Sequence, residues 1–182
     1  MAGEIQLNGT SFATESSSVI TLNSNVLLPG QKVQNIVYAV KSDENSASTT
    51  STSLSIVKDA SNNEEWAVTI SGLSSNKVLL MFQVGVLTTA NTSTTRAGLG
   101  ICRDTISNII YESNVESIQN YQGTGSSLAK QGIIATLIYV DTPTSSSHTY
   151  KLCYKANADN ATRSMTILST FPNTFLAMEI LT

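Results

Sequence analysis

Long apolar runs interrupt a chain that is otherwise polar, with Ser, Thr and Asn at roughly a third of its positions. The three longest runs are Val78–Val86, Gly132–Val140 and Phe175–Leu181. A strand with one solvated face alternates apolar and polar residues, but these runs are apolar at both odd and even positions. One face of each can fill the core of the domain. The other face requires a cover, and a second copy of the chain is the simplest one.

The remaining pattern predicts strands throughout. β-branched residues are frequent, turn residues recur at about every tenth position, and no window combines helical spacing with a capped start. An all-β antiparallel sandwich or barrel is therefore expected. The predicted strands cover residues 32–40, 53–58, 65–70, 77–86, 97–103, 108–112, 131–140, 148–155, 163–168 and 174–181.

The first thirty residues differ from the rest because they contain only short strand-like pieces, at 4–7, 19–22 and 25–28. These pieces hold too few apolar residues to form a core alone. We predict an extended N-terminal arm or short shaft over residues 1–30 and a β-sandwich domain over residues 31–182, with the arm held by a partner protein. The candidate docking residues of the arm are Ile5, Leu7, Phe12, Ile20, Leu22 and Leu27.

Charge and composition exclude several classes of protein. The 182-residue chain has a net charge of −3 and no basic stripe, which argues against nucleic-acid binding. No run reaches the ~18 apolar residues of a membrane-spanning helix. The N-terminus has no signal-peptide pattern, so synthesis in a cytoplasm is expected. Cys102 and Cys153 lack metal-ligand spacing and are expected to be reduced thiols on strands, with a disulfide between neighbouring strands as the alternative.

Catalytic residue patterns are weak. A Ser-His-Asp triad would combine His148 with Asp141 and one of the serines at 145–147, all in or beside one turn, whereas triad members converge from separate elements. Asp59–Asn62 and Asn157–Asn160 lack the spacing of a calcium loop and are typical of turns. We therefore expect no enzyme activity, no cofactor and no metal.

Glu179 is unusual because it interrupts the last apolar run. Alternation places it on the face opposite Met178 and Ile180. Two interpretations stay open: the carboxylate faces solvent, or it pairs at a subunit contact with a basic residue such as Arg103, Arg163 or Lys155.

Five short segments carry a resemblance to a known family: Pro29–Gln34, Lys41–Asp43, Ser51–Ser53, Ile70–Leu80 and Thr174–Ile180. They are similar to segments of a domain found in virion proteins of tailed phages, especially marine ones. Those domains resemble the trimeric jelly rolls of the C1q and tumour-necrosis-factor type, and the similarity covers roughly residues 29–182. It implies a homotrimer in which one sheet and the last strand face a threefold axis. The interface residues expected on this basis are Leu80, Phe82, Val84, Ile134, Leu137, Tyr139, Phe175, Ala177 and Ile180.

The resemblance implies a structural protein at the virion surface, attached by its arm to the major capsid protein or to a tail protein. A capsid decoration or cement protein is the first expectation. The alternative is a tail-fibre tip that binds a host glycan or surface protein. A polysaccharide hydrolase would need paired acids at a defined separation, and the acids of this chain are scattered. Neither nucleic acid nor a membrane is an expected partner. The candidate recognition-loop residues are Asn91, Asn120, Tyr121, Gln122 and Thr144.

Overall fold

The computed structural model describes most of the chain in two compact units, Met1–Lys32 and Val33–Thr182. The residues it describes are 3–7, 10–16, 19–22, 33–41, 46–61, 63–73, 77–90, 95–113, 117–120, 129–144, 146–157 and 164–181. Within these ranges every regular element is a β-strand, and no helix is present that could cross a membrane.

The N-terminal unit is a three-stranded antiparallel sheet of β1 (Gly3–Leu7), β2 (Thr10–Ser16) and β3 (Val19–Leu22), in that order. Sequence reasoning predicted separate extended pieces and missed β2, because backbone pairing does not require the apolar side chains that the prediction sought. Ile5 and Leu7 lie on β1, Phe12 on β2, and Ile20 and Leu22 on β3. The predicted piece at 25–28, with Leu27, lies outside the described residues.

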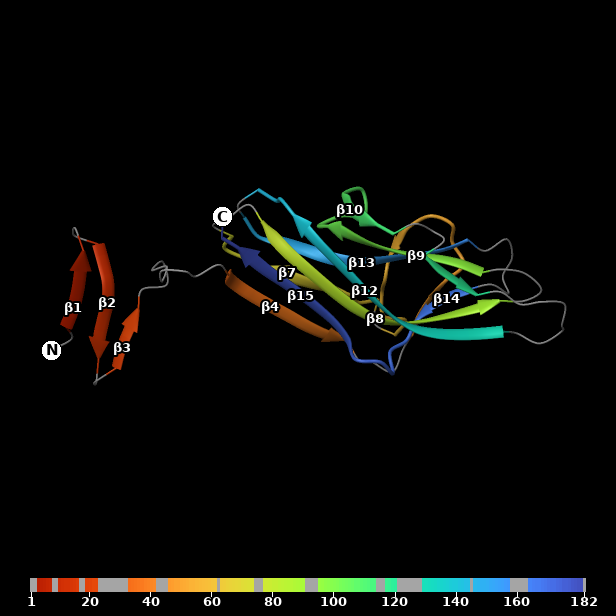
Figure 1. Ribbon diagram of the computed structural model, residues 1–182, viewed down its shortest axis with the longest axis horizontal. Coiled ribbons are helices and arrows are strands. Elements are labelled where there is room, and N and C mark those ends of the chain that lie inside the picture. The colour runs from red at the N-terminus through yellow and green to blue at the C-terminus, as the bar shows by residue number, and fades with distance from the viewer. Residues whose placement is uncertain are drawn as a thin grey trace. The chain divides into compact units, whose positions relative to one another are not determined.

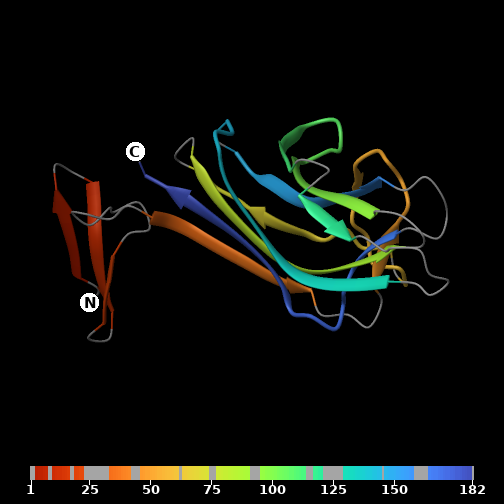
Figure 2. The same cartoon turned by 45° about the vertical axis from the view of Figure 1, so that its right-hand side comes forward.

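The C-terminal unit is a sandwich of two antiparallel sheets (Figures 1 and 2). In the first sheet, β12 pairs with β8 along its whole length, from Val78 opposite Asp141 to Ala90 opposite Ala129. On the other side of β8, β15 pairs with its first half and β14 with its second half. The strands of this sheet are β4 (Val33–Lys41), β15 (Asn173–Ile180), β8 (Val78–Ala90), β14 (Ser164–Ile167), β5 (Ala47–Thr49) and β12 (Ala129–Asp141).

The second sheet is centred on β9 and β13, which run antiparallel side by side. Its strands are β10 (Ile109–Glu112), β9 (Thr95–Arg103), β13 (His148–Asn157), β6 (Ser55–Ile56), β11 (Ile118–Asn120) and β7 (Ala67–Ile70). Each strand predicted after residue 52 has a counterpart, so the all-β antiparallel prediction is confirmed. The prediction missed the three-residue strands β5 and β11, which are too short to show a period.

The core lies between the two sheets and is built from alternate residues of each strand. Ile70 of β7 and Trp66, which directly precedes that strand, are fully buried in the core. Tyr150 and Leu152 of β13 are also fully buried. The rings of Phe82 and Phe175 meet edge-to-face with centroids 4.8 Å apart. Buried aromatic pairs of this geometry add about 0.5–1.5 kcal/mol beyond the burial of their area. This single core therefore accounts for one face of each apolar run.

Candidate functional site

The outward side of the first sheet carries large apolar side chains, of which seven are exposed and three are half-buried among the described residues. We call this surface the apolar face. It consists of Ile36, Tyr38, Val40, Leu79, Met81, Ile134, Ile138, Val140, Leu176 and Met178.

Strand register arranges the apolar face in rows across four strands. One row runs from Ile36 on β4 through Met178 and Leu79 to Val140 on β12. The side chains along such a row lie within contact distance of their neighbours. The four strands come from distant parts of the sequence, so the face exists only in the folded sheet.

The next row is also apolar and consists of Tyr38, Leu176, Met81 and Ile138. The third row is mostly polar and consists of Val40, Thr174, Gln83 and Thr136. It therefore bounds the two rows that are entirely apolar.

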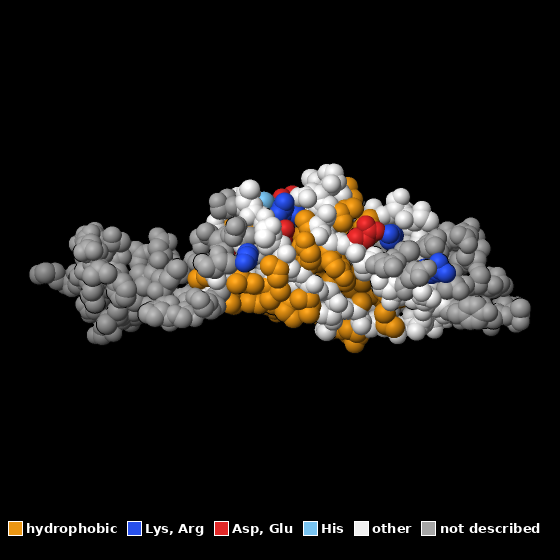
Figure 3. Space-filling view, turned by 45° about the horizontal axis from the view of Figure 1, so that its top comes forward, with side chains coloured by type: hydrophobic (Ala, Val, Ile, Leu, Met, Phe, Trp, Pro, Cys, Tyr) orange, Lys and Arg blue, Asp and Glu red, His pale blue; other side chains and the backbone are white. Residues whose placement is uncertain are grey.

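Exposure sets this face apart from the rest of the sandwich. The seven most exposed of its side chains range from 37% for Met81 to 70% for Tyr38. Figure 3 shows hydrophobic side chains gathered over one side of the domain. None of the ten residues is charged. Monomeric proteins expose single apolar residues routinely but seldom gather them in this way. The prediction of an uncovered second face is therefore confirmed for Gly132–Val140 and for Met81 and Gln83 of Val78–Val86, whereas the outward side chains of Phe175–Leu181 are half-buried.

Most of the predicted interface residues face the core in the single chain. Six of the nine are buried inside the single chain, where they cannot contact another subunit: Leu80, Phe82, Val84, Leu137, Phe175 and Ala177. Tyr139 and Ile180 are half-buried, and only Ile134 is well exposed. The prediction took the inward positions because a run that is apolar at every residue does not indicate which alternate set faces the core.

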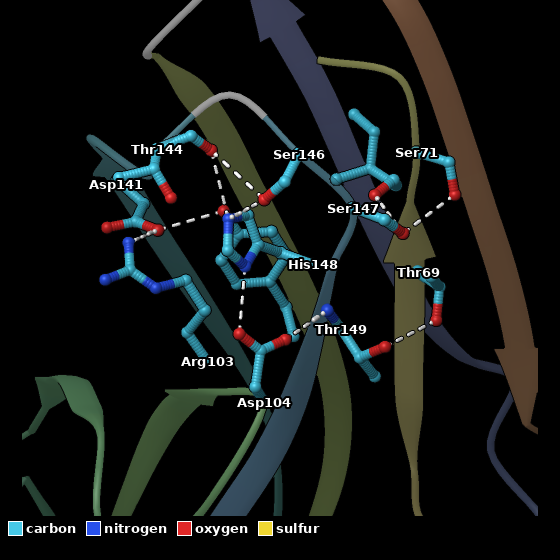
Figure 4. A network of polar contacts seen from close by, with 12 residues as sticks. Thr69, Ser71, Arg103, Asp104, Asp141, Thr144, Ser146, Ser147, His148 and Thr149 are labelled. Atoms are coloured by element: carbon cyan, nitrogen blue, oxygen red, sulfur yellow. Dashed lines mark hydrogen bonds and ion pairs between the residues drawn. The ribbon is translucent and has the colours of Figure 1, made fainter.

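A second cluster is polar and joins the β12–β13 loop to the turn after β9 (Figure 4). His148 Nδ1 lies 2.9 Å from Asp104 Oδ2, and His148 Nε2 lies 3.0 Å from Ser146 Oγ. The structure thus pairs His148 with Asp104, which sequence reasoning missed, in place of the Asp141 that was considered. No sequence signal could connect these residues, because Asp104 is 44 positions away from His148.

The cluster has the order of contacts of a triad but differs in its surroundings. The Thr144 carbonyl oxygen also lies 3.1 Å from His148 Nε2 and competes with Ser146 for that nitrogen. Asp104 accepts a hydrogen bond from the Thr149 amide, and this bond and the one to His148 hold the pKa of Asp104 below its ordinary value, although burial alone would raise it. Asp104 also adopts a left-handed backbone with φ of 64°, which Asp tolerates well. These contacts tie two loops together.

Asp141, the predicted partner of His148, belongs to a neighbouring buried group. Its carboxylate accepts hydrogen bonds from Arg103 at 2.8 Å and from the Tyr150 hydroxyl at 2.9 Å. Burial, and then the bond to Asp141, raise the pKa of Tyr150 well above its ordinary value. The group therefore holds a neutral phenol and an ion pair at the end of the sandwich.

Glu179 does not face solvent, which was one of the two interpretations of its place in the sequence. The side chain is fully buried, and its Oε2 accepts a hydrogen bond of 2.6 Å from Asn35 Nδ2. Alternation correctly placed it opposite Met178 and Ile180, but that side is the interior. A buried carboxylate needs hydrogen-bond donors in place of water, and β4 supplies one.

Cys102 and Cys153 are free, as predicted, and both are buried. They lie on adjacent strands, with Cys102 opposite Lys151 and Cys153 opposite Gly100. The two thiols are hydrogen-bonded to each other, which lowers the pKa of Cys102. The same bond, together with burial, raises the pKa of Cys153. In the part of the chain that the structure describes, no cluster of His, Cys, Asp or Glu could hold a metal ion.

The predicted recognition residues are only partly described. Asn91, Tyr121 and Gln122 lie outside the described residues. Asn120 was expected in an exposed loop but lies on β11, buried, where its Nδ2 donates to the Thr88 carbonyl oxygen. Thr144 is exposed.

Comparison with known proteins does not assign the chain to a family. No known protein family matches the chain, and no curated protein matches it. Among solved structures, the crystal structure of the infectious bursal disease virus VP2 subviral particle is similar over 80% of this chain, with 10% sequence identity and a TM-score of 0.25. The chain corresponds to 37% of the length of that protein.

Proposed function

We propose that this chain is a structural protein of a virus particle that self-associates through the apolar face and attaches to the particle by its N-terminal unit. The uncovered apolar face is the observation that carries the proposal. The sequence resemblance to phage virion domains supplies the biological setting.

The size of the face is enough for part of a stable contact, but not for all of it. Strands ~4.8 Å apart and a rise of ~3.3 Å per residue give the four-strand face a footprint of about 400 Å². Stable interfaces bury about 800 Å² on each partner. The face therefore supplies about half of what one partner needs, and the flanking edge strands or loops would supply the rest.

The chemistry of the face favours another copy of the chain as the partner. A surface without charge on any of its ten residues resembles an obligate subunit contact more than a transient one. An obligate contact requires a partner that is present whenever the chain is made, and the chain itself meets that condition.

The order of strands is consistent with the jelly roll that the sequence suggested. Five short strands each share a sheet with a strand next to them in the sequence: β5, β6, β10, β11 and β14. Among the other strands of the sandwich, β4, β8, β12 and β15 belong to the first sheet, and β7, β9 and β13 alternate with them in the second. Crossing between sheets at successive connections is how a jelly roll is wound. We therefore propose the trimer of the resembled domains as the assembly, without catalytic activity or cofactor.

Sedimentation velocity of the full chain tests self-association. A trimer that persists at sub-micromolar concentration is expected, and a monomer would refute the proposal. Gold-labelled antibody on purified particles tests the location. Label spread over the head would support a decoration protein, and label at the end of the tail would support the alternative, a receptor-binding tip. Particles without any label would refute the virion role.

A further inference from the structure

A hollow lies at the margin of the apolar face, beyond the polar third row. It has a volume of about 440 Å³ and is lined by Gly85, Gly132, Ile133, Ile134, Leu168 and Phe171. Gly85 lies opposite Ile134 in the register of β8 and β12, so the hollow continues the row pattern of the face.

Two glycines line the hollow: Gly85 is covered by the side chain of Phe171, and Gly132 is open. At Gly85, an added Cβ would lie 2.7 Å from the Phe171 Cβ, which shows that the Phe171 side chain lies directly on this glycine. At Gly132, the nearest atom to an added Cβ is the Val86 carbonyl oxygen at 4.0 Å. Among the described residues, the space above Gly132 is therefore open, and a side chain introduced there would meet none of them closer than 4.0 Å at its Cβ.

The most exposed large apolar side chain of the described residues is Tyr38, on the opposite edge of the same sheet. Its strand, β4, pairs with β15 on one side only among the described strands. A tyrosine ring gives a large apolar contact at low cost in side-chain entropy, while its hydroxyl stays solvated at an open hollow.

We propose that the hollow around Gly132 receives Tyr38 of a second copy of the chain. This inference rests on the self-association proposed above and assigns the contacting residues. Tyr38 and the hollow lie on opposite edges of one sheet. Each copy can therefore insert its Tyr38 into the hollow of one neighbour and bind the Tyr38 of another neighbour in its own hollow. Heterologous contacts form a ring when the rotation between neighbours closes, and a trimer is the ring that a rotation of 120° gives.

Filling the hollow is the first test. We expect Gly132→Leu to raise the dissociation constant at least roughly tenfold, as loss of one well-packed interface contact does, with the far-ultraviolet circular dichroism unchanged. Gly132→Ala adds too little volume to block the ring and should keep the oligomer mass. Tyr38→Ala should weaken association to a similar degree, and Tyr38→Phe should retain it.

Cross-linking gives a second measurement that does not depend on a blocking variant. A chain with both Tyr38→Cys and Gly132→Cys should form disulfide-linked oligomers on mild oxidation, whereas either substitution alone should not. The native cysteines are fully buried and are present in every variant as an internal control.

The outcomes separate the two proposals. An oligomeric wild type whose mass is unaffected by both Gly132→Leu and Tyr38→Ala, and whose double-cysteine variant does not cross-link, overturns the assignment of the hollow and leaves self-association standing. A monomeric wild type overturns both. Should Gly132→Leu fail to fold, Tyr38→Ala and the cross-link still decide.

Discussion

Placing one charge on the apolar face separates association from folding. Ile138 lies on β12 opposite Met81, in the middle of the second row, and is 59% exposed in the single chain. Ile138→Lys should therefore leave the folded chain almost unaffected, because substitutions at exposed positions usually change stability by less than about 0.5 kcal/mol. In the assembly, the same position would be covered.

The cost to association follows from the structure. Full burial of an isoleucine contributes about 1.5–3 kcal/mol, and more than half of Ile138 remains to be buried at a contact. The substitution forfeits about 1–2 kcal/mol per chain and also forces a lysine ammonium to lose water, which costs several kcal/mol more. A loss of at least about 4 kcal/mol corresponds to a dissociation constant raised about a thousandfold.

Sedimentation velocity measures the oligomer, and thermal unfolding checks the fold. The matched control is Ile109→Lys on β10, where the same change is made at 42% exposure in the other sheet. We expect the control to keep the wild-type mass and Ile138→Lys to sediment as a folded monomer. If both variants keep the oligomer, the apolar face is not the contact surface and the reasoning is wrong.

Three further predictions concern stability and thiol chemistry. Phe175→Ala should destabilise the chain by about 3–5 kcal/mol in chemical denaturation, because it opens a cavity in a core that is fully closed at this ring. Asp104→Asn should lower the melting temperature at pH 7. Since the folded pKa of Asp104 is depressed, its contribution is present above its unfolded pKa of about 3.9 and is lost as the pH falls through the folded value. The variant and wild type should therefore converge in acid, and a constant difference would contradict this. Cys102 and Cys153 should both resist a thiol reagent in the folded chain and both react in denaturant, and fast labelling of either in native buffer would contradict their burial.

Strand positions were readable from the sequence because they depend on local patterns. On β13, Tyr150, Leu152 and Tyr154 alternate with polar or small residues, so the local pattern indicates the set of side chains that the structure buries. On β8, apolar residues occupy both the odd and the even positions. The same argument could therefore locate the strand, but it could not show which of its side chains face the core. The predicted interface therefore included Leu80 and Phe82, which the structure buries.

The polar cluster was beyond sequence reasoning for a different reason. His148 and Asp104 meet because β9 and β13 are neighbours in the second sheet, and the order of strands in a sheet is set by how the whole sandwich closes. Glu179 illustrates the same limit, since only the pairing of β15 with β4 brings Asn35 to its carboxylate.

The sequence by itself determined an all-β chain whose longest strands need cover on both sides, because periodicity and turn residues act within a few positions of the backbone. Only the tertiary structure decided which side chains remain uncovered. The rows of the apolar face join β4, β15, β8 and β12, segments separated by up to about 140 residues, and their register follows from hydrogen bonds between strands that no local pattern encodes.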